Sequence, residues 1–441
     1  MGGKTTATAA APAAGPVRRD DIAPWVPWVM WGFGALFYCY GFFQRVAPSV
    51  MVGELMRDFA VGAAITGTLS SLYFYTYAGL QIPVGLVLDR FGPRRVLAAA
   101  AVVSCLGSAG FAFADSLTLA YVGRALIGVG AAVTWVAALT LAGNWFPPRR
   151  FALISGLTMA LGMAGAVGGQ APLAAAVTAV GWRGTMIGAA VFAAVLGVAA
   201  WLIVRDRPGA DARSRPQAAE HGFSAGLSAA LRRRQIWVIG LFGAMTSAPM
   251  LAFAGLWGVP YMMRLYDMSR PEAAVMTSIM LVGWGFGSPF FGWLTDAIGR
   301  RRLPMMLSSG GSLACTLTWL YGGLPLAALY PLLFLTGLFA GGIVLTFATA
   351  RENAPGWASG ATLGVVNMAV MASGGIFQPL IGWFLDLAWT GETAGGARLY
   401  SVEAWRSAMA VLPVCNALAL TAALLVRETH CRPHGEAAAA A

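Results

Sequence analysis

Charged side chains are scarce in this sequence, and their scarcity argues against a water-soluble fold. They make up 11% of the 441 residues, whereas 58% of the residues are hydrophobic. Soluble domains usually carry about a quarter of their residues as charged side chains. The mean hydropathy of +0.69 over this length requires lipid as part of the solvent, because the polar residues are too few to cover the apolar surface. The chain is therefore predicted to be an integral membrane protein.

Lysine and cysteine are also scarce. Lys4 is the one lysine among 29 basic residues, and the net charge of +11 comes from arginines, most of them in short clusters between apolar stretches. Such clusters are typical of membrane topology signals, so we expect no nucleic-acid partner, which would need a basic soluble face. The five cysteines include no short-spaced pair, which indicates neither a disulfide framework nor a metal knuckle. We expect no metal site and no cofactor.

Apolar runs long enough to cross a bilayer recur along the chain. A span needs about 20 mostly apolar residues, and breaks at charged and Pro/Gly clusters leave twelve such runs. The first six are 26–50, 65–88, 96–114, 118–143, 151–177 and 184–204, and the second six are 236–262, 273–295, 303–321, 325–349, 357–385 and 405–426. The predicted fold is all-α, with twelve transmembrane helices in two six-helix bundles.

A polar segment divides these helices six and six. Residues 205–234 form this linker, which is too short for a catalytic domain. We expect it in the cytoplasm, between an N-terminal bundle over 25–204 and a C-terminal bundle over 235–427. The ends of the chain, 1–24 and 428–441, are expected to be disordered cytoplasmic tails.

The distribution of basic residues predicts the orientation. If both termini lie inside, 21 of the 29 basic residues fall in inside segments, six in outside loops and two within spans. Cytoplasmic loops carry such an excess of arginine and lysine, so both termini are expected in the cytoplasm. The abundance of Ala, Gly and Arg favours a GC-rich bacterial genome, and hence the bacterial inner membrane.

A short pattern occurs twice, at a constant offset of 207 residues. Its five positions are Gly85, Asp89, Gly92, Arg94 and Arg95 after the second span, and Gly292, Asp296, Gly299, Arg301 and Arg302 after the eighth. Internal repeats related by a pseudo-twofold axis are one way in which transporters build two bundles around a midplane site.

The repeated pattern, G-x-x-x-D-x-x-G-x-R-R, resembles the signature of the major facilitator superfamily. The helix count, the central linker and the position of both copies agree with that resemblance, which covers residues 25–427. It implies transport by alternating access, with both loops acting as latches of a cytoplasmic gate. The alternative for the arginines alone is a generic turn with positive-inside charge.

Two further segments are similar to motifs of the same family. The run 123–132 resembles its helix 4 motif, in which an arginine, here Arg124, precedes a face of small residues. The tenth span carries Leu333 at the equivalent position, so the packing of the repeat does not require that arginine. Glycines of the fifth span have antiporter-type spacing, but Gln170 stands where a proline is expected, so antiport is not inferred.

Ionisable groups inside a membrane span are costly and usually functional. Arg45 and Arg124 are the two clear examples, and both are expected in the outer half of the membrane at comparable depth. The family resemblance implies that their helices line a central cavity. Two guanidinium groups facing one cavity could bind a carboxylate or phosphate bidentately. The alternatives are a gate ion pair of Arg45, with Glu54, Asp58 or a partner on another helix, and a role in conformational coupling for Arg124.

Six polar or aromatic residues are further candidates for the solute site, and each also has a structural explanation. The sequence around Arg45 resembles helix 1 of organic-anion and organophosphate transporters and, in its Y-C-Y element, a dipeptide-transporter branch. Two pairs of aromatic residues are four apart and so share a helix face, where interhelical packing, an aromatic belt or an outer gate are the alternatives. The six candidates are Tyr38, Gln44, Tyr73, Tyr77, Trp257 and Tyr261.

The sequence predicts a secondary transporter of a small organic solute that bears a carboxylate or phosphate, such as an organic acid, amino acid or short peptide. No nucleophile–base pair or phosphate loop stands out, so we expect no enzyme. The expected partners are the solute and the lipid bilayer, and the expected assembly is a monomer. Two alternatives remain: a copper importer using the methionine pairs 159/163 and 276/280, and a membrane sensor that binds solute without moving it.

The coupling ion stays open because no acidic residue falls deep in a span. A proton relay through a membrane usually needs such a group. A coupling proton would have to use the solute's own carboxylate, Glu54 or Asp115. Uniport and exchange are equally compatible with the sequence.

Overall fold

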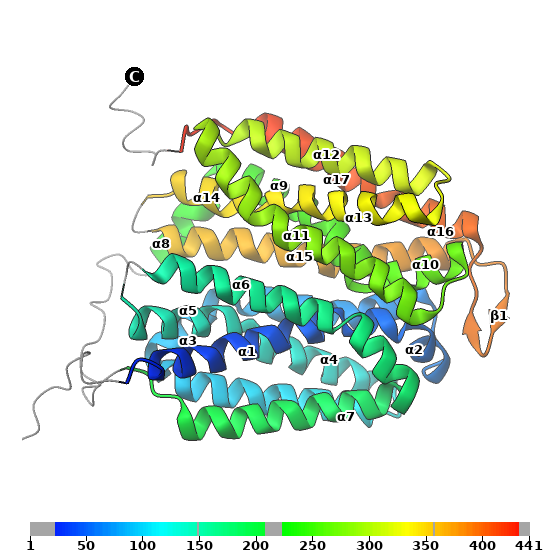
Figure 1. Ribbon diagram of the computed structural model, residues 1–441, viewed down its shortest axis with the longest axis horizontal. Helices are drawn as coiled ribbons and strands as arrows, with labels where there is room; N and C mark the ends of the chain where they lie inside the picture. Colours follow the sequence, from blue (N-terminus) through cyan, green and yellow to red (C-terminus); the bar gives the residue numbers. More distant parts are fainter. Residues whose placement is uncertain (1–22, 148–149, 208–222, 356–357, 432–441) are drawn as a thin grey trace, which may run out of the picture.

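The computed structural model describes residues 23–147, 150–207, 223–355 and 358–431, and nearly all of them are helical (Figure 1). Most of the predicted apolar runs coincide with helices in the structure. The first half contains α1 (Val26–Val46), the 3-10 turn η2 (Ala47–Val50), α2 (Val52–Asp58), α3 (Ala63–Ala112), α4 (Leu117–Ala132), α5 (Thr134–Trp145), α6 (Phe151–Gly168) and α7 (Ala171–Ile203).

The second half repeats this order after a short helix in the linker. It contains α8 (Phe223–Leu231), α9 (Arg234–Pro249), the π-helix η4 (Met250–Trp257), α10 (Gly258–Tyr266), α11 (Arg270–Ile298), α12 (Arg302–Tyr321), α13 (Leu326–Ala340), the 3-10 turn η5 (Gly341–Ile343), α14 (Val344–Glu352), α15 (Ser359–Leu387), α16 (Val402–Met409) and α17 (Val411–Leu425). A hairpin of two short strands, β1 (Thr393–Ala394) and β2 (Ala397–Arg398), precedes α16.

Two long helices run across the boundary between two predicted spans, and a glycine with non-helical backbone angles divides each of them. Gly92 divides α3 with a φ of 77°, and Gly181 divides α7 with a φ of 73°. This left-handed conformation is readily adopted by glycine. Nine helical stretches of the described residues are long and apolar enough to cross a membrane, and one of them, Leu153–Ile203, holds two spans. The first part of α3 and the helix α12 complete the predicted twelve.

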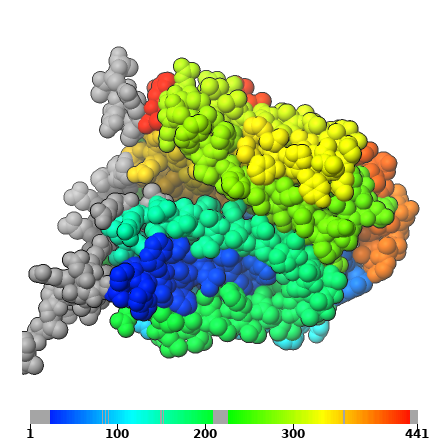
Figure 2. Space-filling model, in the orientation of Figure 1, coloured from blue at the N-terminus to red at the C-terminus, as the bar shows by residue number. Residues whose placement is uncertain are grey.

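The helices form two bundles, as the sequence predicts. In Figure 1, α1 and α3–α7 lie in one bundle and α9–α17 in the other. Figure 2 shows the two bundles packed side by side. The described chain begins and ends on the same face of the molecule, near α8, and we call this face the terminal side. The opposite face, which carries α2 and the β-hairpin, is called the hairpin side.

The outer surface of both bundles is apolar, whereas many of the helix contacts are made through glycine. Leu202 and Trp293 are among the large hydrophobic side chains that are mostly exposed, as expected of a lipid-facing surface. A Cβ built on Gly165 would lie 2.0 Å from the carbonyl oxygen of Cys39, and one on Gly337 would lie 1.9 Å from that of Met280. Such positions let the backbones of neighbouring membrane helices touch.

The two bundles are joined on the hairpin side. A Cβ on Gly382 of α15 would lie 2.3 Å from the carbonyl oxygen of Ala63 of α3, so these helices meet backbone to backbone. Going along α3 toward the terminal side, the last hydrogen bond between the bundles runs from Asn367 Nδ2 to Gln81 Oε1 at 2.8 Å. Beyond it, the hydrogen bonds and ion pairs that join one described residue to another stay within a bundle.

Candidate solute-binding site and gates

Arg45 lies in the last turn of α1 and is 4% exposed. No described carboxylate lies within ion-pair distance of it, and its buried Nε has no hydrogen-bond partner among the described residues. Its guanidinium carbon lies 4.0 Å from the ring centroid of Phe42, 5.4 Å from that of Tyr77 and 5.7 Å from that of Tyr73. Cation–π contacts stabilise a desolvated cation by about 2 kcal/mol. Burying an unpaired charge costs several kcal/mol, so the rings alone leave Arg45 undercompensated.

Arg124 lies beside Arg45, but both of its Nη groups already donate hydrogen bonds to the backbone of α1. Its Nη1 donates to the carbonyl oxygen of Gln44 at 2.7 Å, and its Nη2 donates to that of Arg45 at 3.3 Å. These carbonyls belong to the last turn of α1, where a helix leaves its acceptors without partners. The side chain is 1% exposed. Arg124 therefore caps α1 and holds the backbone of Arg45 through both Nη groups, whereas its buried Nε, like that of Arg45, has no hydrogen-bond partner among the described residues.

Tyrosines from two helices surround Arg45. Tyr73 and Tyr77 share one face of α3, with their ring centroids 5.9 Å apart, and the hydroxyl of Tyr73 donates to the carbonyl oxygen of Gly41 at 3.0 Å. Tyr38 lies two turns before Arg45 on the same face of α1, with its hydroxyl 3.7 Å from Met159 Sδ. These rings and the guanidinium of Arg45 make a cluster with hydroxyl groups and one unpaired positive charge.

Three other candidates make structural contacts. Gln44 is fully buried, and its Nε2 donates to the hydroxyls of Tyr40 at 2.6 Å and Ser108 at 2.8 Å. Trp257 is fully buried at the end of η4 and donates from Nε1 to the carbonyl oxygen of Gln378 at 2.8 Å. Tyr261 is also fully buried, among aromatic rings of the second bundle. An exposed aromatic belt therefore does not describe this pair.

In this state Arg45 pairs with neither Glu54 nor Asp58, the two acids of the hairpin side that the sequence offered as its gate partners. Glu54 of α2 instead forms an ion pair with Arg270 at the start of α11, across the two bundles. Asp58 pairs with its neighbour Arg57 and with Arg183. Burial raises the pKa of Asp58, but hydrogen bonds from the indole of Trp182 and from these arginines outweigh it and lower the pKa.

Asp386 and Gln170 also join the bundles on the hairpin side. The carboxylate of Asp386 accepts hydrogen bonds from the backbone N–H groups of Ala63 at 3.0 Å and Ala64 at 2.9 Å, and so caps the start of α3. Gln170 donates from Nε2 to the carbonyl oxygen of Ala254 at 2.6 Å and accepts from the hydroxyl of Thr277 at 3.0 Å. The residue that replaces the expected proline thus connects the two bundles.

The first copy of the repeated motif docks onto the end of α7. The backbone N–H of Arg94 donates to Asp206 Oδ1 at 2.7 Å, and its Nε donates to the carbonyl oxygen of Trp201 at 2.9 Å. A Cβ on Gly92 would lie 2.5 Å from Asp206 Oδ2, so this close approach requires glycine. Arg95 is exposed. The side chain of Asp89 lies outside the described part of the chain.

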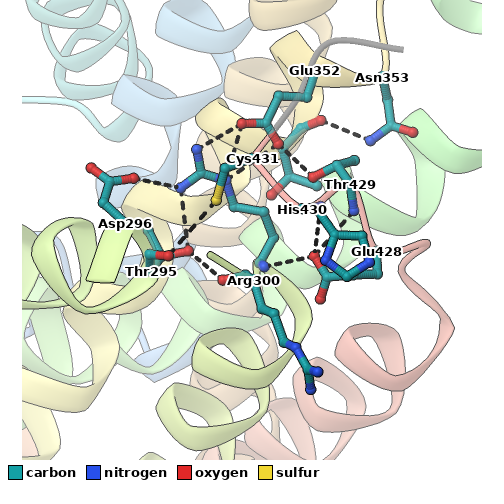
Figure 3. A network of polar contacts seen from close by, with 11 residues as sticks. Thr295, Asp296, Arg300, Glu352, Asn353, Glu428, Thr429, His430 and Cys431 are labelled. Atoms are coloured by element: carbon teal, nitrogen blue, oxygen red, sulfur yellow. Dashed lines mark hydrogen bonds and ion pairs between the residues drawn. The ribbon is translucent and has the colours of Figure 1, made fainter. Parts of the chain in front are cut away.

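The second copy forms a larger polar network (Figure 3). Arg301 donates from Nη2 to Glu352 Oε1 at 2.6 Å, whereas its contact with Asp296 is 3.4 Å long and Asp296 is 74% exposed. Glu428 Oε1 accepts from the backbone N–H of Arg301 at 2.8 Å, and its Oε2 accepts from that of Arg302 at 3.0 Å. Burial raises the pKa of Glu428, but these and the following backbone N–H groups outweigh it and hold the pKa below its usual range.

Both copies therefore use the same device, which the sequence analysis missed. An acid that follows the last helix of each bundle, Asp206 or Glu428, accepts the backbone N–H of the equivalent arginine, Arg94 or Arg301. The described contacts of each copy stay within its own bundle. In this state no hydrogen bond or ion pair between described residues of the two loops joins the bundles, and the side chain of Asp89 is not among those residues.

Comparison with known proteins places this architecture in a family. The family model described as Major Facilitator Superfamily matches residues 31–259 and 250–440. A putative tartrate transporter of Agrobacterium vitis is 24% identical over 84% of this chain and 88% of its own length. A probable sulfoacetate transporter of Cupriavidus necator is 24% identical over 64% of this chain and 68% of its own length.

Two further comparisons define the extent of the similarity. An uncharacterized transporter of Bacillus subtilis is 33% identical, but the match spans about a third of either chain, 32% of this one and 33% of the relative. Among solved structures, a bacterial homolog of the human lysosomal transporter Spinster, in an inward-facing and occupied conformation, superposes with a TM-score of 0.71 at 15% identity. That superposition covers 92% of this chain and 97% of the other.

Proposed function

The chain belongs to the major facilitator superfamily and is a multi-pass membrane transporter, and we propose that its solute is a small organic anion bound by Arg45. The proposed solute bears a carboxylate or phosphate, as organic acids, amino acids and short peptides do. Arg45 acts as the anion anchor, and the tyrosines around it contact the body of the solute.

The unpaired charge of Arg45 is the observation that carries this proposal. The residue is buried, no described carboxylate pairs with it, and its guanidinium contacts aromatic rings. A bound carboxylate or phosphate would supply the missing counter-charge through charge-assisted hydrogen bonds in a medium of low polarity. Arg124 supports the site indirectly, because it fixes the turn of α1 that carries Arg45.

The relatives support the same class of solute. Tartrate and sulfoacetate, which the names of two relatives give as their solutes, are small organic anions. The acid groups of both anions carry the negative charge that could pair with the guanidinium of Arg45, which has no described carboxylate beside it.

The charge distribution supports an orientation with the terminal side in the cytoplasm of a bacterial inner membrane. With that orientation, the contacts of the hairpin side close the outer entrance. Solute then leaves toward the cytoplasm, and the loops that carry Arg94 and Arg301 latch the terminal side in the opposite state.

A thermal-shift experiment on the purified full-length chain tests the proposal. Tartrate, sulfoacetate and phosphate are the probes, and threitol, in which the carboxylates of tartrate are replaced by hydroxymethyl groups, is the neutral control. Because a ligand stabilises the state that binds it, at least one anion should raise the melting temperature of the wild type and of Arg183→Gln, a control on the hairpin side. The same anion should leave Arg45→Gln unchanged.

Equal stabilisation of the wild type and Arg45→Gln would refute the anchor role of Arg45. Stabilisation by Cu(I) instead of any anion would favour the methionine pairs. An anion that binds to the wild type but is not moved into vesicles would favour a sensor over a transporter.

A further inference from the structure

A cavity lies between the bundles on the hairpin side, and its lining does not include the cluster around Arg45. Its volume is about 320 Å³, which is at the lower end of the range for small-molecule sites. Residues of η2 and α2 form one wall, and residues of α10, α16 and the segment 397–400 form the other. Much of the lining is apolar and includes Val52, Met56, Met263 and Trp405.

Four charged side chains line this cavity, and three of them are arginines. Arg264, Arg270 and Arg398 line it together with one acid, Glu54, and because Arg398 also has Asp386 as a partner outside the lining, an excess of one positive charge remains. Glu54 pairs with Arg270. Arg398 pairs with Asp386, which is outside the lining, at 3.1 Å.

Arg264 is the arginine with donors to spare. The residue is exposed, and its Nε donates to the carbonyl oxygen of Tyr400 at 3.0 Å, which holds one side of the guanidinium at the cavity wall. Its two Nη groups make no hydrogen bond with any residue that the structure describes. A guanidinium held in this way presents a fork that matches a carboxylate.

We propose that this cavity is a second anion site, which binds a small carboxylate with an apolar body. The carboxylate lies between Arg264 and Arg270, and the apolar body contacts Met56, Met263 and Trp405. The excess of positive charge selects an anion, and the apolar walls select a ligand with a hydrophobic or aromatic part. The site goes beyond the anchor role of Arg45 and does not depend on it.

Occupation of this site competes with one contact between the bundles. An anion that binds Arg270 takes the place of the carboxylate of Glu54. Since Glu54 belongs to the first bundle and Arg270 to the second, the ligand loosens the closed hairpin side as it binds. The site therefore couples capture of an anion to opening of this entrance.

Binding of para-fluorobenzoate, followed by fluorine NMR of the ligand with the purified full-length chain, tests the proposal. All variants carry Arg45→Gln, so that binding at the first site does not contribute. We expect the probe to bind in this background and its affinity to fall about tenfold in Arg264→Gln, as for a lost charge-assisted hydrogen bond. Arg406→Gln removes an exposed arginine of α16 that does not line the cavity, and should leave the affinity unchanged.

The substitution Glu54→Gln tests whether Glu54 competes with the ligand for Arg270, and it should change the affinity in the opposite direction to Arg264→Gln. It frees Arg270, so the affinity for para-fluorobenzoate should rise several-fold, whereas para-fluorobenzyl alcohol should bind weakly to every variant. No binding in the Arg45→Gln background, or equal affinities of Arg264→Gln and Arg406→Gln, would overturn the site. Weaker binding after Glu54→Gln would overturn the competition. Failure of the anchor role of Arg45 is a separate result, because it is measured with tartrate, sulfoacetate and phosphate in the thermal-shift experiment and not with para-fluorobenzoate.

Discussion

Gln170 offers the sharpest test of how the hairpin side is held closed. It is fully buried, and it makes two hydrogen bonds across the bundles, from its Nε2 to Ala254 O at 2.6 Å and from the hydroxyl of Thr277 to its Oε1 at 3.0 Å. Gln170→Met keeps the length of the side chain but removes both bonds. If they break when the bundles part, their loss destabilises the closed state alone, whereas the bond from the hydroxyl of Ser49 to Gln170 Oε1 at 3.3 Å stays within the first bundle and is lost in both states.

The expected magnitude follows from the number of bonds. Each neutral hydrogen bond contributes about 0.5–1.5 kcal/mol, so the loss of two shifts the equilibrium by about 1–3 kcal/mol. This corresponds to a change of about 5- to 150-fold in the ratio of the two states. A hairpin-open state that is rare in the wild type would therefore become measurable in Gln170→Met.

Pulsed EPR distances between spin labels on the hairpin side measure this ratio. Asp115 and Glu403 are exposed on the first and second bundle, and each can carry a label on a cysteine after the native cysteines are replaced. Gln170→Met should add a population with a longer distance between the labels. The control Asn416→Leu removes a buried amide whose bonds to Ser312 and Thr316 stay within one bundle, and should not. Identical distance distributions in wild type and Gln170→Met would refute the reasoning.

Three substitutions test the loops of the terminal side through thermal unfolding. Gly92→Ala should lower stability by about 1–2 kcal/mol or more, because φ is 77° and the new Cβ would meet Asp206; an unchanged melting temperature would contradict this contact. Glu352→Gln should destabilise the chain by removing the carboxylate that pairs with buried Arg301, and an equally stable variant would contradict that pairing. Glu428→Gln should lower stability at neutral pH but not in acid. The folded pKa of Glu428 is depressed, so its stabilisation is present above the unfolded pKa and lost as the pH falls through the folded one. A difference that persists in acid would contradict this assignment.

The helices were predictable because the bilayer sets their length. Runs of about 20 apolar residues between arginine clusters predicted spans that the structure places within a few residues. Gly92 and Gly181 lie between predicted spans, where the backbone reverses with positive φ. The pattern could not predict the breaks inside spans, such as the π-helix η4, because local hydropathy does not encode them.

The candidate site was predictable in part. The free-energy cost of placing a charge inside a membrane span identified Arg45 and Arg124 as candidates. This criterion could not distinguish a guanidinium that caps a helix from one that faces a cluster of rings. That distinction depends on where the carbonyl oxygens of Gln44 and Arg45 point, which is set by the fold.

The residues that support the motif loops were missed for different reasons. Asp206 and Glu428 each lie three residues after the last helix of a bundle. A search for acids just after the last span of each half could therefore have found them. Glu352 has Trp145 at the equivalent position of the first half, so the repeat gave no signal for it. Gln170 was noticed as a departure from a family pattern, but only the structure showed its contacts across the bundles.

Uptake of radiolabelled tartrate and sulfoacetate into proteoliposomes tests the central claim most directly. The wild type should accumulate at least one of these anions, Arg183→Gln should retain that uptake, and Arg45→Gln should lose it while remaining folded by circular dichroism. Uptake by Arg45→Gln at the wild-type rate would contradict the claim that Arg45 binds the transported anion.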